Sequence, residues 1–165
     1  QQQQKKEQQQ YSVLSSPPPQ MITPPPQMTS DEEVAEIMVS GNTSDIRDMF
    51  QGNPERATSV VAAYGLTPLH LTARFGYDAV AIMLIDEFHI SPDSIEGGKN
   101  LLMRAIDHNE IDFAMHLLTA YYFDLSHTDA DGLTTLDYAL NSQSEALVNS
   151  ILQIQEEQLE NTTST

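Results

Sequence analysis

The sequence predicts an all-α solenoid of stacked helix-turn-helix units, joined by short turns and preceded by a disordered tail. Glycines recur at spacings of 33 and 34 residues, at Gly65, Gly98 and Gly132. Apolar residues recur at fixed offsets from these glycines, and a Thr-Pro pair and a later Gly bracket one amphipathic segment. A period of this length, with two short helices per unit, is typical of proteins built by stacking repeats.

The aligned apolar positions predict which residues face the core. In the first helix of each unit, the aligned sets are Leu69, Leu102 and Leu136, then Thr72, Ala105 and Ala139, then Ala73, Ile106 and Leu140. The second helices repeat the spacing i, i+1, i+4, i+5, which lies on one helix face. These positions are Val80, Ala81, Leu84 and Ile85, then Phe113, Ala114, Leu117 and Leu118, then Leu147, Val148, Ile151 and Leu152.

Helix ends can be predicted around the clearest unit. Thr67 is expected to cap a helix with its side chain, and Pro68 suits the next position because that amide has no partner within the helix. Gly76 can adopt positive φ and end the helix, so that the second helix runs antiparallel to the first. Upstream, Gly41 matches Gly76, and Ser30 with Glu33 forms a capping box that opens the first unit.

The chain divides into three parts. Residues 1–29 are rich in Gln and Pro and are expected to be disordered, because they have too little apolar surface to fold. Residues 30–155 form the repeat domain, with units at about 30–63, 64–96, 97–130 and 131–155, the first and last acting as caps. Residues 156–165 show no apolar face and are expected to fray.

Composition limits the possible partners. The formal net charge of −17 favours basic partners and disfavours nucleic acid and anionic membrane surfaces. The chain has no Cys, which suits a reducing compartment, and no apolar run approaches the roughly 18 residues of a membrane span. We therefore expect a cytoplasmic or nuclear location, with no direct nucleic-acid or membrane binding.

The sequence contains no recognisable catalytic set. It has no P-loop, GxGxxG or HExxH motif, and no two of its five His residues are four residues apart as in a helical metal site. We therefore expect no enzymatic activity, no cofactor, no metal and no small-molecule substrate. His70 is interpreted as a structural residue of the turn that opens its helix.

The segment from Thr67 to Thr72 reads TPLHLT and resembles the T-P-L-H-x-A signature of the ankyrin repeat, with Thr72 in place of Ala. The segment GLTTLDYA at 132–139 resembles the variant in which Asp137 replaces His, and FDLSHTDADG at 123–132 resembles the turn between repeats. The resemblance covers about residues 31–155. It implies four repeats and assigns His70 to hydrogen bonding within the fold.

In ankyrin folds, the turn tips and exposed first-helix positions form a concave binding surface. The resemblance therefore implies partner-binding positions. They are Ala63, Tyr64, Leu66, Arg74 and Phe75 in the second unit, Glu96, Lys99, Asp107 and His108 in the third, and Asp129, Asp131, Leu133 and Asn141 in the fourth. Phe75 could instead pack against the next unit, so binding and packing both remain open for this residue.

The predicted function is a non-enzymatic protein-interaction module that binds a partner protein with a basic segment. A narrower hypothesis is a regulator of a transcription factor, resembling the inhibitor-of-κB or Notch-type ankyrin proteins, because acidic repeats follow a Gln/Pro-rich tail. An alternative is a targeting or adaptor domain of a larger enzyme or signalling protein whose catalytic part lies elsewhere.

Overall fold

The computed structural model describes residues 30–163, so the expected disorder of residues 1–29 lies outside the described part. Within this range the chain forms eight α-helices and one 3₁₀ helix and has no β-strand longer than an isolated bridge. The helices are α2 (Asp31–Ser40), α3 (Thr43–Gly52), η1 (Pro54–Thr58), α4 (Pro68–Phe75), α5 (Asp78–Asp86), α6 (Leu101–Asp107), α7 (Ile111–Ala120), α8 (Thr135–Ser142) and α9 (Glu145–Thr163). The predicted all-α class is confirmed.

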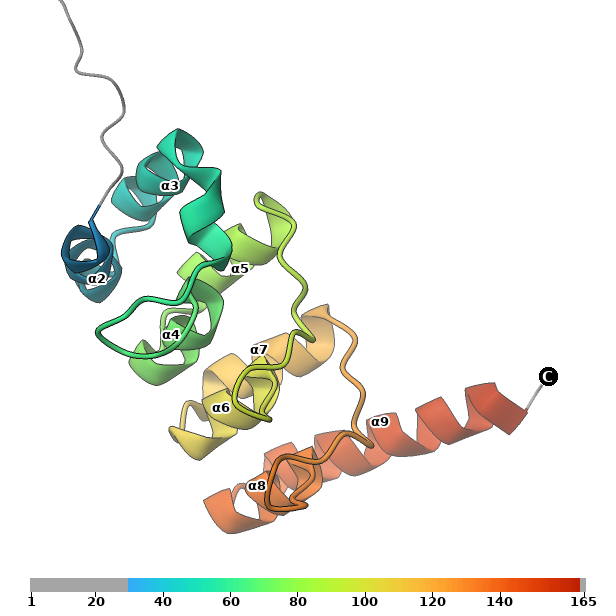
Figure 1. The fold of residues 1–165 in the computed structure, drawn as a ribbon. Coiled ribbons are helices and arrows are strands. Elements are labelled where there is room, and N and C mark those ends of the chain that lie inside the picture. The colour runs from blue at the N-terminus through green and yellow to red at the C-terminus, as the bar shows by residue number, and fades with distance from the viewer. Residues whose placement is uncertain (1–29, 164–165) are drawn as a thin grey trace, which may run out of the picture.

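The helices form antiparallel pairs stacked in two layers (Figure 1). The first helices α2, α4, α6 and α8 lie on one side, and the second helices α3, α5, α7 and α9 lie on the other. Contacts run along each layer, from α4 to α6 to α8 and from α7 to α9, as well as between the two helices of each pair. This is the stacked architecture that the 33-residue period predicts.

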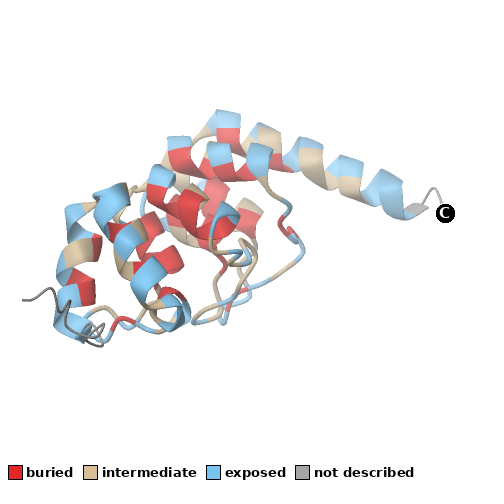
Figure 2. Cartoon of the chain, turned by 90° about the horizontal axis from the view of Figure 1, so that it is seen from above, coloured by how far each residue is buried: buried red, intermediate tan, exposed pale blue. Residues whose placement is uncertain are grey.

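The core is mainly aliphatic, with Phe50, Phe113 and Phe123 also buried, and lies between the two layers (Figure 2). The predicted core residues of the second and third units have exposed fractions of 7% or less, among them Leu69, Leu102, Ile85 and Leu118. The prediction is wrong at two positions of the fourth unit, because Leu140 is 55% exposed and Leu152 is 42% exposed. Both side chains belong to α8 and α9, the last helix pair of the described residues.

Glycine ends the first helix in the first two units, as predicted. Gly41 and Gly76 are C-caps with φ of +66° and +72°, in the left-handed region that favours glycine. The Tyr77 ring lies over Gly41, and its hydroxyl donates a hydrogen bond of 2.7 Å to the Val39 carbonyl. The glycine therefore lets the second unit dock closely on the first.

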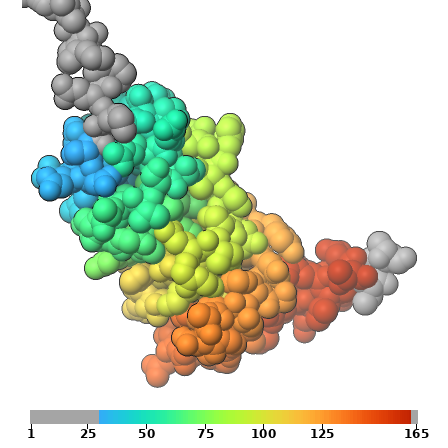
Figure 3. Space-filling view, in the orientation of Figure 1, coloured from blue at the N-terminus to red at the C-terminus, as the bar shows by residue number. Residues whose placement is uncertain are grey.

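The C-terminal segment differs from the prediction. Residues 156–163 do not fray but continue α9, whose last turns project beyond the body of the stack (Figure 3). The Gln158 amide donates a 3.1 Å hydrogen bond to the Phe123 carbonyl, 35 residues away, and Ile154 packs against the core. These tertiary contacts hold the helix where its own sequence shows no apolar face.

Candidate functional site

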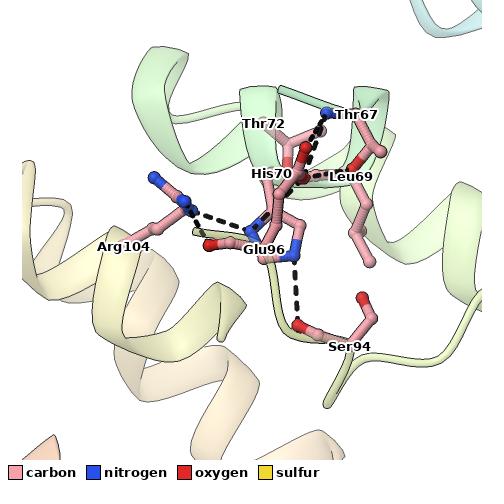
Figure 4. Close-up of polar contacts among 7 residues, drawn as sticks. All are labelled: Thr67, Leu69, His70, Thr72, Ser94, Glu96 and Arg104. Carbon is pink, nitrogen blue, oxygen red and sulfur yellow. Dashed lines mark hydrogen bonds and ion pairs between the residues drawn. The ribbon is translucent and has the colours of Figure 1, made fainter. Parts of the chain in front are cut away.

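A polar network joins the second and third units around the turn that opens α4 (Figure 4). The Glu96 carboxylate accepts hydrogen bonds from the backbone N–H of Thr67, at 2.9 Å, and from its hydroxyl, at 2.7 Å. The Thr67 side chain makes no capping bond to its own helix, so its predicted role as side-chain cap is wrong. Glu96 thus holds the start of α4 from the turn that precedes α6, so this residue, predicted to bind a partner, also supports the fold.

His70 lies inside the same network and is 1% exposed. The Arg104 guanidinium donates from Nε to His70 Nδ1 at 2.8 Å, so the ring proton sits on Nε2 and is donated to the Ser94 carbonyl at 3.1 Å. Burial lowers the pKa of His70 to about 4, a shift that Glu96 opposes and Arg104 reinforces. The ring is therefore neutral at pH 7 and holds the two units together.

In the fourth unit, a carboxylate of the helix itself caps the start of α8. Thr134 occupies the position of Thr67, and Asp137 that of His70. The Asp137 carboxylate accepts the Thr134 backbone N–H at 2.9 Å and its hydroxyl at 3.0 Å, and the Thr134 hydroxyl accepts the Asp137 N–H. An acid at this position makes a complete capping box. In the second unit His70 stands there instead, and the Thr67 N–H is accepted by Glu96.

The repeat register brings the sequence-predicted positions onto one side of the stack. Residues at equivalent positions of adjacent units recur every 33 or 34 residues. They form rows across the molecule: Tyr64, Gly97 and Asp131; Leu66, Lys99 and Leu133; Arg74, Asp107 and Asn141; Phe75, His108 and Ser142. We call the surface made by these rows the first-helix face, because they lie at the turns before α4, α6 and α8 and at the ends of these helices.

An aromatic cluster occupies the second-unit end of the first-helix face. The ring of Phe75 lies between Tyr64, edge-to-face at 5.6 Å, and Tyr77 at 5.4 Å, and all three side chains are half-buried. The guanidinium of Arg74, which is exposed, lies 5.4 Å above the Tyr64 ring. Phe75 is thus packed on two sides within its own unit and still reaches the surface.

A hollow of about 470 Å³ occupies the other end of the first-helix face, between α6 and α8. The predicted residues Asp107, Leu133 and Asn141 line it together with Tyr138. Lys99 pairs with Asp107 at 3.2 Å and lies 5.4 Å above the Tyr138 ring. Three of the predicted binding residues therefore line one depression, and Lys99 contacts two of its lining residues.

Asp129 does not fit the predicted exposed position. It is 7% exposed, its Oδ1 accepts the backbone N–H groups of Asp131 and Leu133 at 2.9 Å each, and its Oδ2 accepts the Tyr138 hydroxyl. The Tyr138 hydrogen bond, followed by the N–H of Leu133, lowers the pKa of the Asp129 carboxyl. Asp129 therefore shapes the turn, and it is Asp131, at the tip, that is exposed.

The remaining predicted residues differ in accessibility. His108 is exposed at the C-cap of α6, and Ala63 is exposed in the turn before α4. Leu66 is half-buried, and its carbonyl accepts the Val61 N–H at 2.8 Å, which closes that turn. Ala63 and His108 can thus meet a partner directly, whereas Leu66 mainly supports the turn.

Comparisons with known proteins agree with this geometry. The ankyrin repeat family model matches residues 64–95. Residues 64–95 are thus an ankyrin repeat, and the stacked helix pairs around them agree with an ankyrin-repeat solenoid. A chain in the crystal structure of the yeast ribosomal protein Rps3 in complex with its chaperone Yar1 has a similar fold, with a TM-score of 0.59 and 17% identity over 75% of this chain and 93% of that one. None of the proteins with curated descriptions matches the sequence.

Two residues of the first-helix face were missed from the sequence. Tyr77 completes the aromatic cluster, and Tyr138 forms a wall of the hollow while donating its hydroxyl to Asp129. Tyr77 precedes a second helix and Tyr138 sits at an inward position of α8, so neither was at a position that the family uses for binding. The sequence contained one signal for Tyr77: it is an aromatic residue directly after the Gly that ends a first helix.

Neither a metal-binding cluster of side chains nor a membrane-spanning helix is found among the described residues. Within residues 30–163, no three or more His, Asp or Glu side chains are arranged to hold a metal ion. Among the helices of this range, none is both long and apolar enough to cross a membrane. The first-helix face presents an aromatic cluster at one end and, at the other, a hollow that Asp107 lines.

Proposed function

We propose that this ankyrin protein is a non-enzymatic interaction module that binds a basic segment of another protein on its first-helix face. The aromatic cluster would supply apolar contact area, and the carboxylates of Asp107 and Asp131 would attract Lys or Arg. Aromatic residues are enriched at protein interfaces, and acidic surfaces speed the approach of basic partners. The related fold described above was solved within a protein–protein complex, which agrees with a binding role.

The proposal rests on the repeat register, which places the aromatic cluster and the carboxylates on the same face of the stack. Tyr64 and Asp131 occupy equivalent positions two units apart, and so do Arg74 and Asn141. A single extended segment crossing the units would therefore meet aromatic rings at one end and carboxylates at the other. Asp107 is partly neutralised by Lys99, so Asp131, which has no ion pair in the described structure, offers the freer charge.

Affinity capture with two matched baits tests the proposal. Asp131→Arg reverses a charge at a turn tip of the first-helix face, and Asp48→Arg reverses one on α3 in the other layer. Both baits have the same net charge, so the long-range attraction of a basic partner is equal for the two. They differ only in where the charge is reversed. We expect the partner to be captured by the unmodified chain and by Asp48→Arg but lost from Asp131→Arg.

The opposite patterns would argue against the proposal. Proteins captured equally by both baits would show that binding occurs away from the first-helix face. Proteins lost equally from both would show that net charge alone controls binding. Thermal melts of the two baits should match that of the unmodified chain, because both substituted residues are exposed.

A further inference from the structure

The last helix pair ends the stack with an aliphatic surface. Leu136 and Leu140 of α8 and Val148 and Leu152 of α9 lie at the positions that stack on a following unit elsewhere in the chain. We call the surface made by these four residues the end face. In Figure 1, α8 and α9 close the stack opposite α2 and α3, with no helix beyond them.

The same positions are covered in the interior of the stack. The equivalents of Leu140 are Ala73, 0% exposed, and Ile106, 2% exposed, whereas Leu140 is 55% exposed. The equivalents of Leu152 are Ile85 and Leu118, both 7% exposed, whereas Leu152 is 42% exposed. The end face thus continues the apolar surface that buries one unit against the next. Its residues occupy the positions that pack against a neighbouring helix pair in the other units.

The opposite end of the stack is capped by polar residues. The exposed side chains of α2 and α3 are acidic or polar apart from Val39, which is 44% exposed. Terminal repeats need such a polar outer face to remain soluble. Because the N-terminal end follows this rule and the C-terminal end does not, head-to-tail stacking of two copies would bury acids of α2 and α3 against leucines.

The acidic charge around the end face indicates what kind of segment would bind there. Residues 105–165 contain eleven Asp and Glu residues and no Lys or Arg. On α9, Glu145 lies three residues before Val148, and Glu156 lies four residues after Leu152, so the two carboxylates flank the apolar pair along one helix face. Two end faces brought together would oppose like charges, whereas a basic helix would pair with them.

We infer that the end face is a second docking surface, which takes an amphipathic helix whose aliphatic side is flanked by Lys or Arg. Its aliphatic residues cover Leu140 and Leu152, as a following repeat would, and its basic residues meet Glu145 and Glu156. This surface is separate from the first-helix face and does not depend on the function proposed for it.

A defined peptide can probe the end face directly. The probe is a fluorescein-labelled helical peptide of Leu and Lys, about 18 residues or five turns long, with Leu along one face. Two control peptides change one property each: one replaces Lys with Glu, and the other replaces Leu with Ser. Fluorescence anisotropy should show binding of the Leu/Lys peptide, no binding of the Leu/Glu peptide and much weaker binding of the Ser/Lys peptide.

Protein variants then locate the site. The double variant Leu140→Gln, Leu152→Gln should weaken binding of the Leu/Lys peptide about tenfold or more, because it removes both central anchors. The matched control Val39→Gln changes an exposed aliphatic residue at the other end of the stack and should leave the affinity unchanged. Glu145→Gln with Glu156→Gln should also weaken binding while leaving the aliphatic residues in place.

Three results would overturn the inference. The peptide could bind the Leu140→Gln, Leu152→Gln variant as well as it binds the unmodified chain, or the Leu/Glu peptide could bind equally well. Sedimentation equilibrium could also show a dimer that this variant dissociates, which would make a second copy the occupant. If the leucine variant were to lose its fold, the two glutamate substitutions and methyl NMR shifts at Leu140 and Leu152 would still decide the question.

Discussion

The Glu96 carboxylate, in the turn before α6, binds the start of α4, since it accepts both the N–H and the hydroxyl of Thr67, 29 residues earlier. The first amides of a helix need partners from outside the helix. In this molecule that partner comes from the turn that leads into α6, the first helix of the third unit, so capping and stacking depend on one side chain. The stacking of the second and third units is therefore specified by polar contacts as well as by apolar burial.

Removing this carboxylate should loosen the junction between the two units. Glu96→Ala leaves the Thr67 amide unpaired in a part-buried site, and we expect a loss of about 1–3 kcal/mol in the free energy of unfolding. Denaturant unfolding measures it, with Glu36→Ala, an exposed acid of α2, as the control. An equal effect of the two substitutions would mean that the Thr67–Glu96 contact contributes nothing to stability.

His70 should make stability depend on pH. Its folded-state pKa of about 4 lies below the ordinary value of 6.5, so the unfolded chain binds more protons between these two pH values. The contribution of neutral His70 is fully present above pH 6.5 and is lost as the pH falls towards 4, by up to roughly 3 kcal/mol.

Unfolding free energies measured across this range for two variants isolate the effect. His70→Asn should flatten the pH dependence between 6.5 and 4, whereas His116→Asn, which removes an exposed ring of α7, should retain it. If His70→Asn showed the same pH dependence as the unmodified chain, other groups would be responsible for it.

Three glycines should respond differently to alanine. At Gly41, a Cβ would lie 2.8 Å from the Tyr77 ring and φ is +66°, so both a clash and backbone strain oppose substitution. At Gly65, φ is +64° but the space is open, and at Gly52 neither obstacle exists. We expect losses of about 2–4 kcal/mol for Gly41→Ala, about 1 for Gly65→Ala and none for Gly52→Ala. Thermal melts giving a different order would contradict the tight docking of Tyr77.

Equivalent leucines should differ in their contribution to stability. Leu118→Ala, in an interior unit at 7% exposure, should cost about 2–4 kcal/mol. Leu152→Ala, at the same repeat position in the last unit, should cost less than about 1 kcal/mol, because the side chain is already 42% exposed. Denaturant midpoints measure both, and similar losses would show that Leu152 is covered in solution.

The interior of the fold could be predicted from the sequence because its determinants are periodic. Leu69, Leu102, Leu84 and Leu117 recur at constant spacing, and each is covered by neighbouring helices on both sides. Gly76 marks the end of α4 through its own backbone requirement. Both signals are local or repeat at a fixed distance, so a single sequence contains them.

Two of the mispredicted features depend on contacts distant in sequence, and a third depends on a local turn. Thr67 was expected to cap its own helix, but a carboxylate from the next turn takes its amide. The last turns of α9 were expected to fray, but Gln158 binds the Phe123 carbonyl. Asp129 was expected to face solvent, but Tyr138 and two backbone amides surround it. The partners of Thr67 and Gln158 lie 29 and 35 residues away, whereas those of Asp129 lie within nine residues, in a turn that the apolar repeat pattern does not specify.

The most direct test of binding at the first-helix face is amide hydrogen exchange of the protein with and without its captured partner. Protection should increase in the turns before α4, α6 and α8, at residues 62–66, 96–99 and 129–133, because a bound segment would cross all three. The second helices α5 and α7 should be unchanged. Protection confined to α5 and α7, with no change in these turns, would contradict binding at the first-helix face.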